Sequence, residues 1–240
     1  MKSLKLFLIA AICLGTVTTV NAQRKRIKGS GDIITETRDV KNFTGVSTST
    51  AIDIYLTQGN DFEVVVEADD NLMEYIITEV DNGVLKVRFQ RGINVLWSKR
   101  KVVHISMKEV DLISASSAGD VIGQSPIEAG DLKIRTSSAG DVKLEVYAKS
   151  LDLGTSSSGD ITLSGEADYL EAKTSSAGDI KAFELTVKEA DIHASSAGDV
   201  KITVSDRLYA RASSAGDIQY RGNPPKVDAK SSSAGDVIKR

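Results

Sequence analysis

Cysteine is almost absent from this sequence. The 240 residues contain one, Cys13, inside an apolar segment near the N-terminus. If that segment is a signal peptide, the mature chain has no cysteine, which excludes disulfides, thiolate metal sites and cysteine nucleophiles. Histidine is scarce too, and His104 and His193 lack metal-ligand spacing. The serines lack a Gly-x-Ser-x-Gly context, and no phosphate-binding glycine loop is present. We therefore expect no cofactor and assign no catalytic, cofactor-binding or metal-binding residue.

Residues 1–22 have the pattern of a secretory signal peptide. Lys2 and Lys5 precede an apolar run over 6–20, and Val20-Asn21-Ala22 is a small-x-small cleavage site. A retained anchor is the alternative. Without Lys2 and Lys5 the chain carries 28 basic and 33 acidic side chains, which argues against nucleic acid or anionic membranes as partners. No further apolar stretch could span a bilayer. We expect export to the periplasm, the cell surface or the extracellular space.

One hexapeptide, Ser-Ser-Ala-Gly-Asp-Val or a close variant, occurs seven times after residue 110. Its aspartates are Asp120, Asp141, Asp160, Asp179, Asp199, Asp217 and Asp236, spaced 18 to 21 residues apart. A repeat of this length without helical periodicity predicts one coil of a β-solenoid. Odd positions counted from the aspartate are apolar or small and even positions mostly polar, which is strand periodicity. The predicted fold class is therefore all-β: a right-handed parallel β-helix (β-solenoid) of seven coils over residues 111–240.

The same alternation, carried through the hexapeptide, points the second serine and the glycine inward and the aspartate outward. Seven stacked carboxylates would repel one another, so a compensating interaction is expected. Lysines two positions later (Lys143, Lys181 and Lys201) and basic residues six positions earlier (Arg135, Lys173, His193, Arg211 and Lys230) could supply it. Capping of backbone amides at the corner is a second interpretation. A calcium-binding ladder and a catalytic carboxylate pair stay open as further alternatives.

Residues 23–110 are predicted to form a β-rich N-terminal section that caps one end of the solenoid. Segments 29–33 and 49–54 look like two early copies of the repeat. Strands are predicted at 62–68, 84–89 and 102–107, and a short helix at 69–77 capped by Asp69 or Asp70. Asp81-Asn82-Gly83 predicts a hairpin turn. Residues 90–101, which contain the only tryptophan, Trp97, are predicted to be a loop.

Three front segments together with the repeats carry a resemblance to a known family. Phe-Thr-Gly-Val at 43–46, Ile-Asp-Ile-Tyr-Leu-Thr-Gln-Gly at 52–59 and Gly-Val-Leu-Lys-Val at 83–87 precede the Ser-x-Gly-Asp-Val/Ile repeats. In this order they resemble the head GIN domain family of putative autotransporter adhesins, over most of residues 30–237. The resemblance implies an exported, repetitive β-helical protein at the cell surface, with no established activity and no site residues to transfer.

The sequence thus favours an exported, non-catalytic surface or envelope protein, an adhesin-like binding domain whose ligand is an unknown glycan or protein. The alternatives are a polysaccharide-active β-helix enzyme and a calcium-stabilised structural element. An enzyme would need carboxylates that leave the repeat and converge in a groove, whereas these follow the repeat. The last coil should leave strand edges unpaired, so weak self-association through the C-terminal coil is expected.

Overall fold

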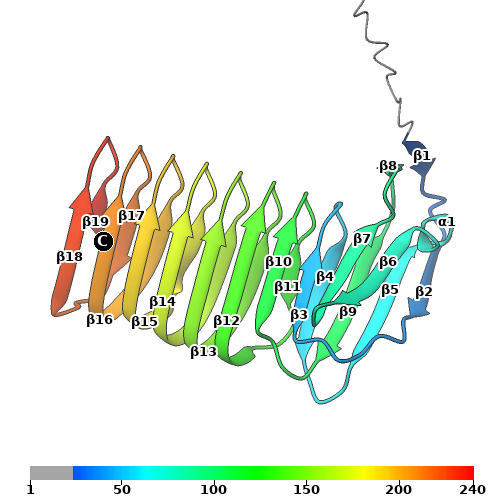
Figure 1. Ribbon diagram of the computed structural model, residues 1–240, viewed down its shortest axis with the longest axis horizontal. Helices are drawn as coiled ribbons and strands as arrows, with labels where there is room; N and C mark the ends of the chain where they lie inside the picture. The colour runs from blue at the N-terminus through cyan, green and yellow to red at the C-terminus, as the bar shows by residue number, and fades with distance from the viewer. Residues whose placement is uncertain (1–23) are drawn as a thin grey trace, which may run out of the picture.

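The computed structural model describes residues 24–240, and the predicted signal peptide at 1–22 lies outside the described residues. Within them the regular secondary structure is β-strand, apart from one four-residue helix. Coils lie side by side along a long solenoid, and antiparallel strands lie at one end (Figure 1). The predicted class, an all-β parallel β-solenoid, is confirmed by the parallel pairing of successive coils.

Each coil consists of two strand segments joined by the Ser-Ser-Ala-Gly-Asp turn. In the central coils the second segment continues round a bend into the first segment of the next coil, so single strands reach 15 residues. Identical repeat positions pair: Leu151 lies opposite Leu132 on one side and Leu170 on the other. The coil strands are β10 (Leu112–Ser116), β11 (Val121–Gly123), β12 (Ile127–Ser137), β13 (Val142–Thr155), β14 (Ile161–Thr174), β15 (Ile180–Ala194), β16 (Val200–Ala212), β17 (Ile218–Arg221), β18 (Lys226–Ser231) and β19 (Val237–Lys239).

The core is the stack of inward aliphatic side chains. Leu151 and Leu153 from one sheet segment, with Ile161 and Leu163 from the other, are at most 2% exposed. Strand alternation puts every second residue inside, and each such side chain contributes roughly 1.5–3 kcal/mol by leaving water. Packing and backbone pairing between coils therefore hold the fold.

The parallel ladder continues into the front section. Strands β3 (Gly45–Thr48) and β4 (Asp53–Gln58) pair in parallel with β10 and β11. Between them, Thr50 and Ala51 have positive φ, as Ser117 and Ala118 do in the first regular turn. The segment at 49–54 is therefore a true copy of the turn, as its sequence indicates. Because β3 and β4 pair with β10 and β11, the sheet continues across residue 110. We therefore propose that residue 110 is not a break between separate folding units, and that it marks the point after which regular coils follow one another without inserted strands.

The remaining front strands are mainly antiparallel. They are β2 (Ile33–Thr37), β5 (Glu63–Asp69), β6 (Ile76–Asp81), β7 (Val84–Phe89) and β9 (Lys101–Met107). β5 pairs antiparallel with β2 and β9, and β6 with β7. The interpretation of 29–33 as a coil copy is wrong, because Ile33 begins β2 and lies opposite Asp69 in an antiparallel pair. The hairpin at Asn82 and Gly83 is confirmed by their positive φ, which a type I′ turn requires.

Two predictions in the front section need correction. Helix α1 (Asp70–Met73) is one turn, and the Asp69 side chain makes no capping hydrogen bond. Residues 90–101 are not only a loop, because they contain β8 (Ile93–Trp97), which pairs in parallel with β1 (Lys25–Lys28). This partner lies about 70 residues earlier in the chain, too distant for a local pattern to indicate it.

Candidate functional surface: the stacked turns and their flanking grooves

The Ser-Ser-Ala-Gly segment is a β-turn with two left-handed residues. In the coil around residue 196, Ser196 has φ 54° and Ala197 has φ 64°, and the Gly198 amide donates to the Ser195 carbonyl at 3.1 Å. Positive φ at both central residues is the type I′ arrangement. Non-glycine residues lose roughly 1–2 kcal/mol each in this conformation. The Ala197 amide also donates to the Ser214 carbonyl of the next coil at 3.1 Å, so stacking offsets that cost.

The turn geometry corrects one prediction and confirms another. The second serine of each copy, predicted to face inward, is exposed in all seven, because two left-handed residues interrupt the strand alternation. The glycine is buried in all seven, as predicted. A Cβ on Gly178 would lie 2.6 Å from Thr155 Oγ1 and 2.9 Å from the Gly159 carbonyl oxygen, so only glycine fits this inner corner.

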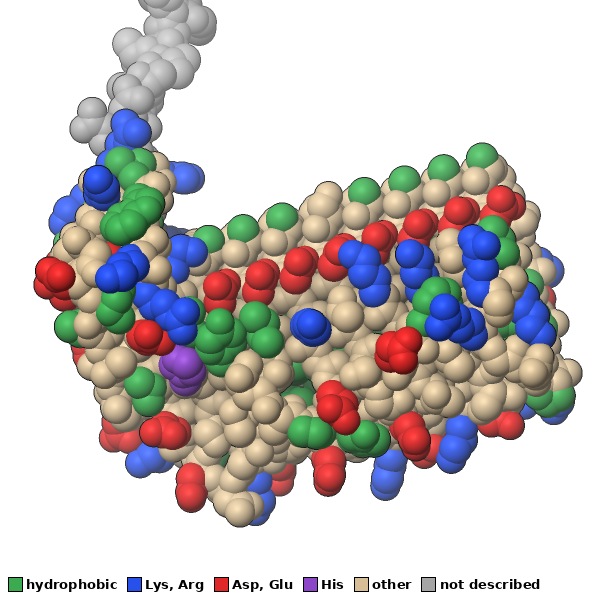
Figure 2. Space-filling model, turned by 180° about the vertical axis from the view of Figure 1, so that it is seen from behind, with side chains coloured by type: hydrophobic (Ala, Val, Ile, Leu, Met, Phe, Trp, Pro, Cys, Tyr) green, Lys and Arg blue, Asp and Glu red, His purple; other side chains and the backbone are tan. Residues whose placement is uncertain are grey.

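The aspartates form a hydrogen-bonded ladder along the outside of the turns, visible as a continuous acidic row in Figure 2. Each backbone amide donates to Oδ1 of the aspartate one coil earlier: Asp141 to Asp120 at 3.0 Å, Asp160 to Asp141 at 3.0 Å, Asp179 to Asp160 at 3.1 Å, Asp199 to Asp179 at 3.2 Å, Asp217 to Asp199 at 3.1 Å and Asp236 to Asp217 at 2.9 Å. Asp53 in the front section extends this ladder, accepting from the Asp120 amide at 3.2 Å. The capping interpretation of the aspartates is therefore confirmed.

Charge compensation along the ladder is local. Lys181 Nζ lies 2.5 Å from Asp160 Oδ2 and 4.0 Å from Asp179 Oδ2, and the hydrogen bond with Asp160 raises the pKa of Lys181. At the front of the row, burial raises the pKa of Asp120, and the hydrogen bond from the Asp141 amide partly opposes this. Lysine therefore neutralises part of the ladder, and backbone amides stabilise the rest.

The basic residues six positions before the aspartates do not compensate the ladder, contrary to the first interpretation. Four of the five pair instead with carboxylates on their own strand or on the paired strand of the next coil: Lys173 with Glu171 and His193 with Asp191 on one strand, and Arg135 with Asp152 and Arg211 with Asp228 between coils. These basic residues lie on the strand before the left-handed turn, whereas each ladder aspartate lies after the turn, so the two sets of side chains project from different faces of the solenoid. The turn therefore separates two charged surfaces that the sequence pattern had merged.

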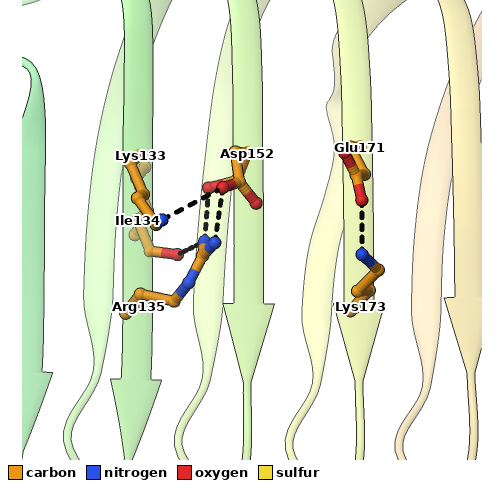
Figure 3. Close-up of polar contacts among 6 residues, drawn as sticks. All are labelled: Lys133, Ile134, Arg135, Asp152, Glu171 and Lys173. Atoms are coloured by element: carbon orange, nitrogen blue, oxygen red, sulfur yellow. Dashed lines mark hydrogen bonds and ion pairs between the residues drawn. The ribbon is translucent and has the colours of Figure 1, made fainter.

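Arg135 and Asp152 show how these pairs join adjacent coils (Figure 3). Arg135 Nη1 donates to the Asp152 carbonyl at 2.7 Å, while Nη2 contacts the Asp152 carboxylate and Lys133 Nζ lies 3.6 Å from it. Burial would raise the pKa of Asp152, but the hydrogen bond and charge of Arg135 outweigh it and lower the pKa. Gly154 leaves room for the arginine, since a Cβ there would lie 2.9 Å from Arg135 Cδ.

Two grooves flank the row of turns. The first, of about 550 Å³, crosses four coils between the basic column of Arg135, Lys173 and His193 and the first serines of the turns; those serines are Ser137, Ser156, Ser175 and Ser195. We call it the serine groove. The second, of about 610 Å³, lies on the other sheet between Lys143, Lys181 and Lys201, with Leu163 and Phe183 in its lining. The serines of the first groove recur on every coil, about 4.8 Å apart, whereas Thr162 interrupts the lysines of the second.

The histidines lie apart in the structure as in the sequence. His104 Nε2 is 3.1 Å from Glu67 Oε2 on β5, and His193 Nε2 is 3.2 Å from Asp191 Oδ1 on β15. Within residues 24–240, no group of three or more His, Cys, Asp or Glu side chains is placed to hold a metal ion. The part of the chain that the structure describes also contains no helix long and apolar enough to cross a membrane.

These features define an extended β-solenoid that presents repeated polar columns. The chain belongs to the family described as "Putative auto-transporter adhesin, head GIN domain", which matches residues 42–224. No curated protein matches the chain.

Several solved structures share the fold. A putative adhesin from Bacteroides fragilis is 21% identical, with a TM-score of 0.80 over 89% of this chain and 100% of that chain. A putative adhesin from Parabacteroides merdae is 24% identical, with a TM-score of 0.71 over 90% of this chain and 99% of that chain. A putative lipid binding protein from Parabacteroides distasonis is 23% identical, with a TM-score of 0.73 over 90% of this chain and 100% of that chain. At these identities the likeness shows a common fold.

Proposed function

We propose that this protein is exported and acts as a non-catalytic, adhesin-like binding domain, with the serine groove as its ligand surface. The observation that carries the proposal is the repetition of one serine hydroxyl on each of four successive coils beside Arg135, Lys173 and His193. The Ser195 hydroxyl already donates to the Thr174 carbonyl at 3.2 Å, so it would accept a hydrogen bond from a ligand. Regularly spaced hydroxyls of this kind suit an extended polar polymer better than a compact small molecule. A glycan chain offers matching hydroxyl and carboxylate groups along its length.

The carboxylates support a binding role over a catalytic one. Oδ1 of each ladder aspartate from Asp120 to Asp217 accepts a backbone amide of the next coil, and Asp152 pairs with Arg135. General acid and base catalysis of glycoside cleavage needs two carboxylates facing one bond, roughly 5–10 Å apart across a groove. Apart from Gly154, every residue that lines the serine groove has a hydroxyl or a basic side chain. The family relatives, named as adhesins, agree with this proposal.

A glycan array probed with the chain starting at Gln23 tests the proposal. Ser175→Tyr would fill the serine groove, and Ser205→Tyr, on an exposed site outside it, is the matched control. Glycan binding that Ser175→Tyr abolishes and Ser205→Tyr preserves would support the proposal. Binding that neither changes, or measurable cleavage of the bound polysaccharide, would contradict it.

We further propose weak self-association through the last coil. β18 pairs with β16 and β19 with β17, and no other described strand pairs with either. β18 is exposed along its whole length, and Val227 on it is 45% exposed. Unpaired strand edges favour pairing with another chain.

A further inference from the structure

A small two-stranded ribbon of β1 and β8 projects from the end of the molecule opposite the last coil (Figure 1). The two strands pair in parallel, with Ile27 opposite Val95, and form a sheet separate from the solenoid. Ile27, Ile93 and Val95 are partly buried against the core. The side chains that alternate with these are exposed and form the outer face of the ribbon.

The end of β8 carries the two most exposed large apolar side chains of the front section, and a register shift in the ribbon places Trp97 opposite Lys28. Leu96 is 52% exposed and Trp97 is 48% exposed, next to each other at the end of β8. Lys28 Nζ lies 5.8 Å from the centre of the Trp97 ring. Exposed side chains such as Leu96 and Trp97 contribute no free energy of burial to folding. Adjacent exposed apolar side chains bordered by charged ones are typical of a surface that contacts another molecule or a membrane interface.

The same region carries an excess of positive charge. Segments 24–34 and 90–101 contain one acidic residue, Asp32, and eight basic ones: Arg24, Lys25, Arg26, Lys28, Arg91, Lys99, Arg100 and Lys101. Of these eight, only Arg100 forms an ion pair with a described carboxylate, that of Glu67. Residues 1–23 contain no acidic residue that could supply another. On the solenoid, by contrast, many of the basic side chains are paired with carboxylates. Figure 2 shows Lys and Arg side chains gathered over this end of the molecule.

Asp69 fixes the base of the ribbon. Its buried carboxylate accepts hydrogen bonds from the backbone amides of Gly31 at 2.6 Å, Lys99 at 2.9 Å and Arg100 at 3.0 Å. Gly31 follows β1 and Lys99 follows β8, so one side chain joins the segments after both strands to β5. The basic and apolar side chains are thus presented on a rigid support.

We propose that the outer face of the β1–β8 ribbon docks on the surface of a bilayer containing anionic phospholipids. Trp97 and Leu96 would lie at the level of the headgroups, where tryptophan is favoured, and the unpaired lysines and arginines would contact lipid phosphates. A soluble polyanion would use the charge but leave both apolar side chains in water. The overall negative charge of residues 23–240 does not oppose this, because the positive charge is concentrated at one end.

Vesicle binding by the chain starting at Gln23 tests this docking. Trp97 is the only tryptophan, so its emission reports on the ribbon alone. With vesicles of phosphatidylcholine and phosphatidylglycerol, we expect cosedimentation and a blue shift of the emission, both weakened by added salt. Vesicles of phosphatidylcholine alone should bind much less.

Matched variants separate the contribution of apolar contact from that of positive charge. Leu96→Ser should reduce the blue shift, and the triple change Arg26→Gln, Lys28→Gln, Arg91→Gln should weaken binding by more than about tenfold. Controls of equal size on the solenoid are Tyr147→Ser and the triple change Lys149→Gln, Lys226→Gln, Lys230→Gln, which should bind like the parent chain. Failure to cosediment with anionic vesicles at low salt would overturn the proposal. So would vesicle binding without a shift of Trp97 emission, or binding to heparin but not to vesicles.

Discussion

The backbone amide of Asp199 donates a hydrogen bond to Oδ1 of Asp179, one coil earlier, at 3.2 Å. This contact explains why the aspartate is repeated. From Asp120 to Asp217, each ladder aspartate donates its backbone amide to the coil before and accepts, through its side chain, the amide of the coil after. A carboxylate at this position caps an amide that strand pairing leaves free at the corner. The repeated aspartate is explained by this structural role before any ligand is considered.

The first prediction concerns the inner corner. Gly198→Val should destabilise the protein by about 3 kcal/mol, because a Cβ there would lie 2.8 Å from Thr174 Oγ1 and 2.9 Å from the Gly178 carbonyl oxygen. Ala177→Ser should change stability by less than about 0.5 kcal/mol, since Ser158 already occupies the equivalent turn position. Thermal or urea unfolding measures both. Equal effects of the two substitutions would show that the inner and outer positions are misassigned.

The second prediction concerns cations on the aspartate ladder. Millimolar calcium should barely move the melting temperature, because Oδ1 of Asp179 and its equivalents already accept backbone amides. Asp179→Asn with Asp199→Asn should remain folded, since the amide oxygen can accept the same hydrogen bond, whereas Asp179→Ala should cost about 1 kcal/mol. A rise of many degrees with calcium, abolished in the double Asn variant, would instead establish a calcium-stabilised ladder.

The third prediction concerns the buried carboxylate of Asp69. Burial opposes its ionisation, but the amides of Arg100, Gly31 and Lys99 outweigh burial and lower the pKa of Asp69. A lowered folded-state pKa stabilises the protein above the unfolded value of about 3.9, and this stabilisation is lost as the pH falls through the folded-state pKa. Asp69→Asn should destabilise by about 1–3 kcal/mol at neutral pH, with a smaller difference in acid. Urea unfolding of both proteins across that range measures it; a constant difference would show that ionisation of Asp69 does not matter.

The fourth prediction concerns the last coil. The chain from Gln23 should show concentration-dependent association by analytical ultracentrifugation, and removal of residues 226–240 should change it by exposing a different pair of strand edges. Association should be unaffected by Leu96→Ser, because β8 lies at the opposite end of the solenoid (Figure 1). A strict monomer at high concentration in every form would rule out association through β18 and β19.

The sequence predicts the coil architecture well because the repeat is local and periodic. The spacing of Asp141, Asp160 and Asp179 gives the coil length, and the inward position of Gly178 follows from strand alternation. The same alternation fails two residues earlier in the turn, at Ser176, which is exposed because Ser176 and Ala177 both have positive φ. Backbone handedness in a turn is not encoded in a period-two pattern.

Long-range pairing explains the other differences. Strand β8 exists because β1 pairs with it, and Asp69 is buried because amides from two distant segments converge on it. The sequence alone does not indicate the serine groove, because its spacing equally allows Arg135 and Lys173 to compensate the aspartate ladder. A nearby acidic residue is the signal that distinguishes these basic residues from the ladder. For Lys173 it is Glu171, two positions earlier, and for Arg135 it is Asp152 in the next coil.

If successive coils bind one extended ligand in the serine groove, the affinity must depend on the length of that ligand. Once an array identifies a glycan, calorimetric titration with fragments of increasing length should show affinity rising until the ligand spans Ser137 to Ser195, about 14 Å at the spacing of parallel coils. Affinity should then level off, and Ser175→Tyr should remove the increase. A single sugar that binds as tightly as the longest fragment, or a length dependence unchanged by Ser175→Tyr, would contradict the account.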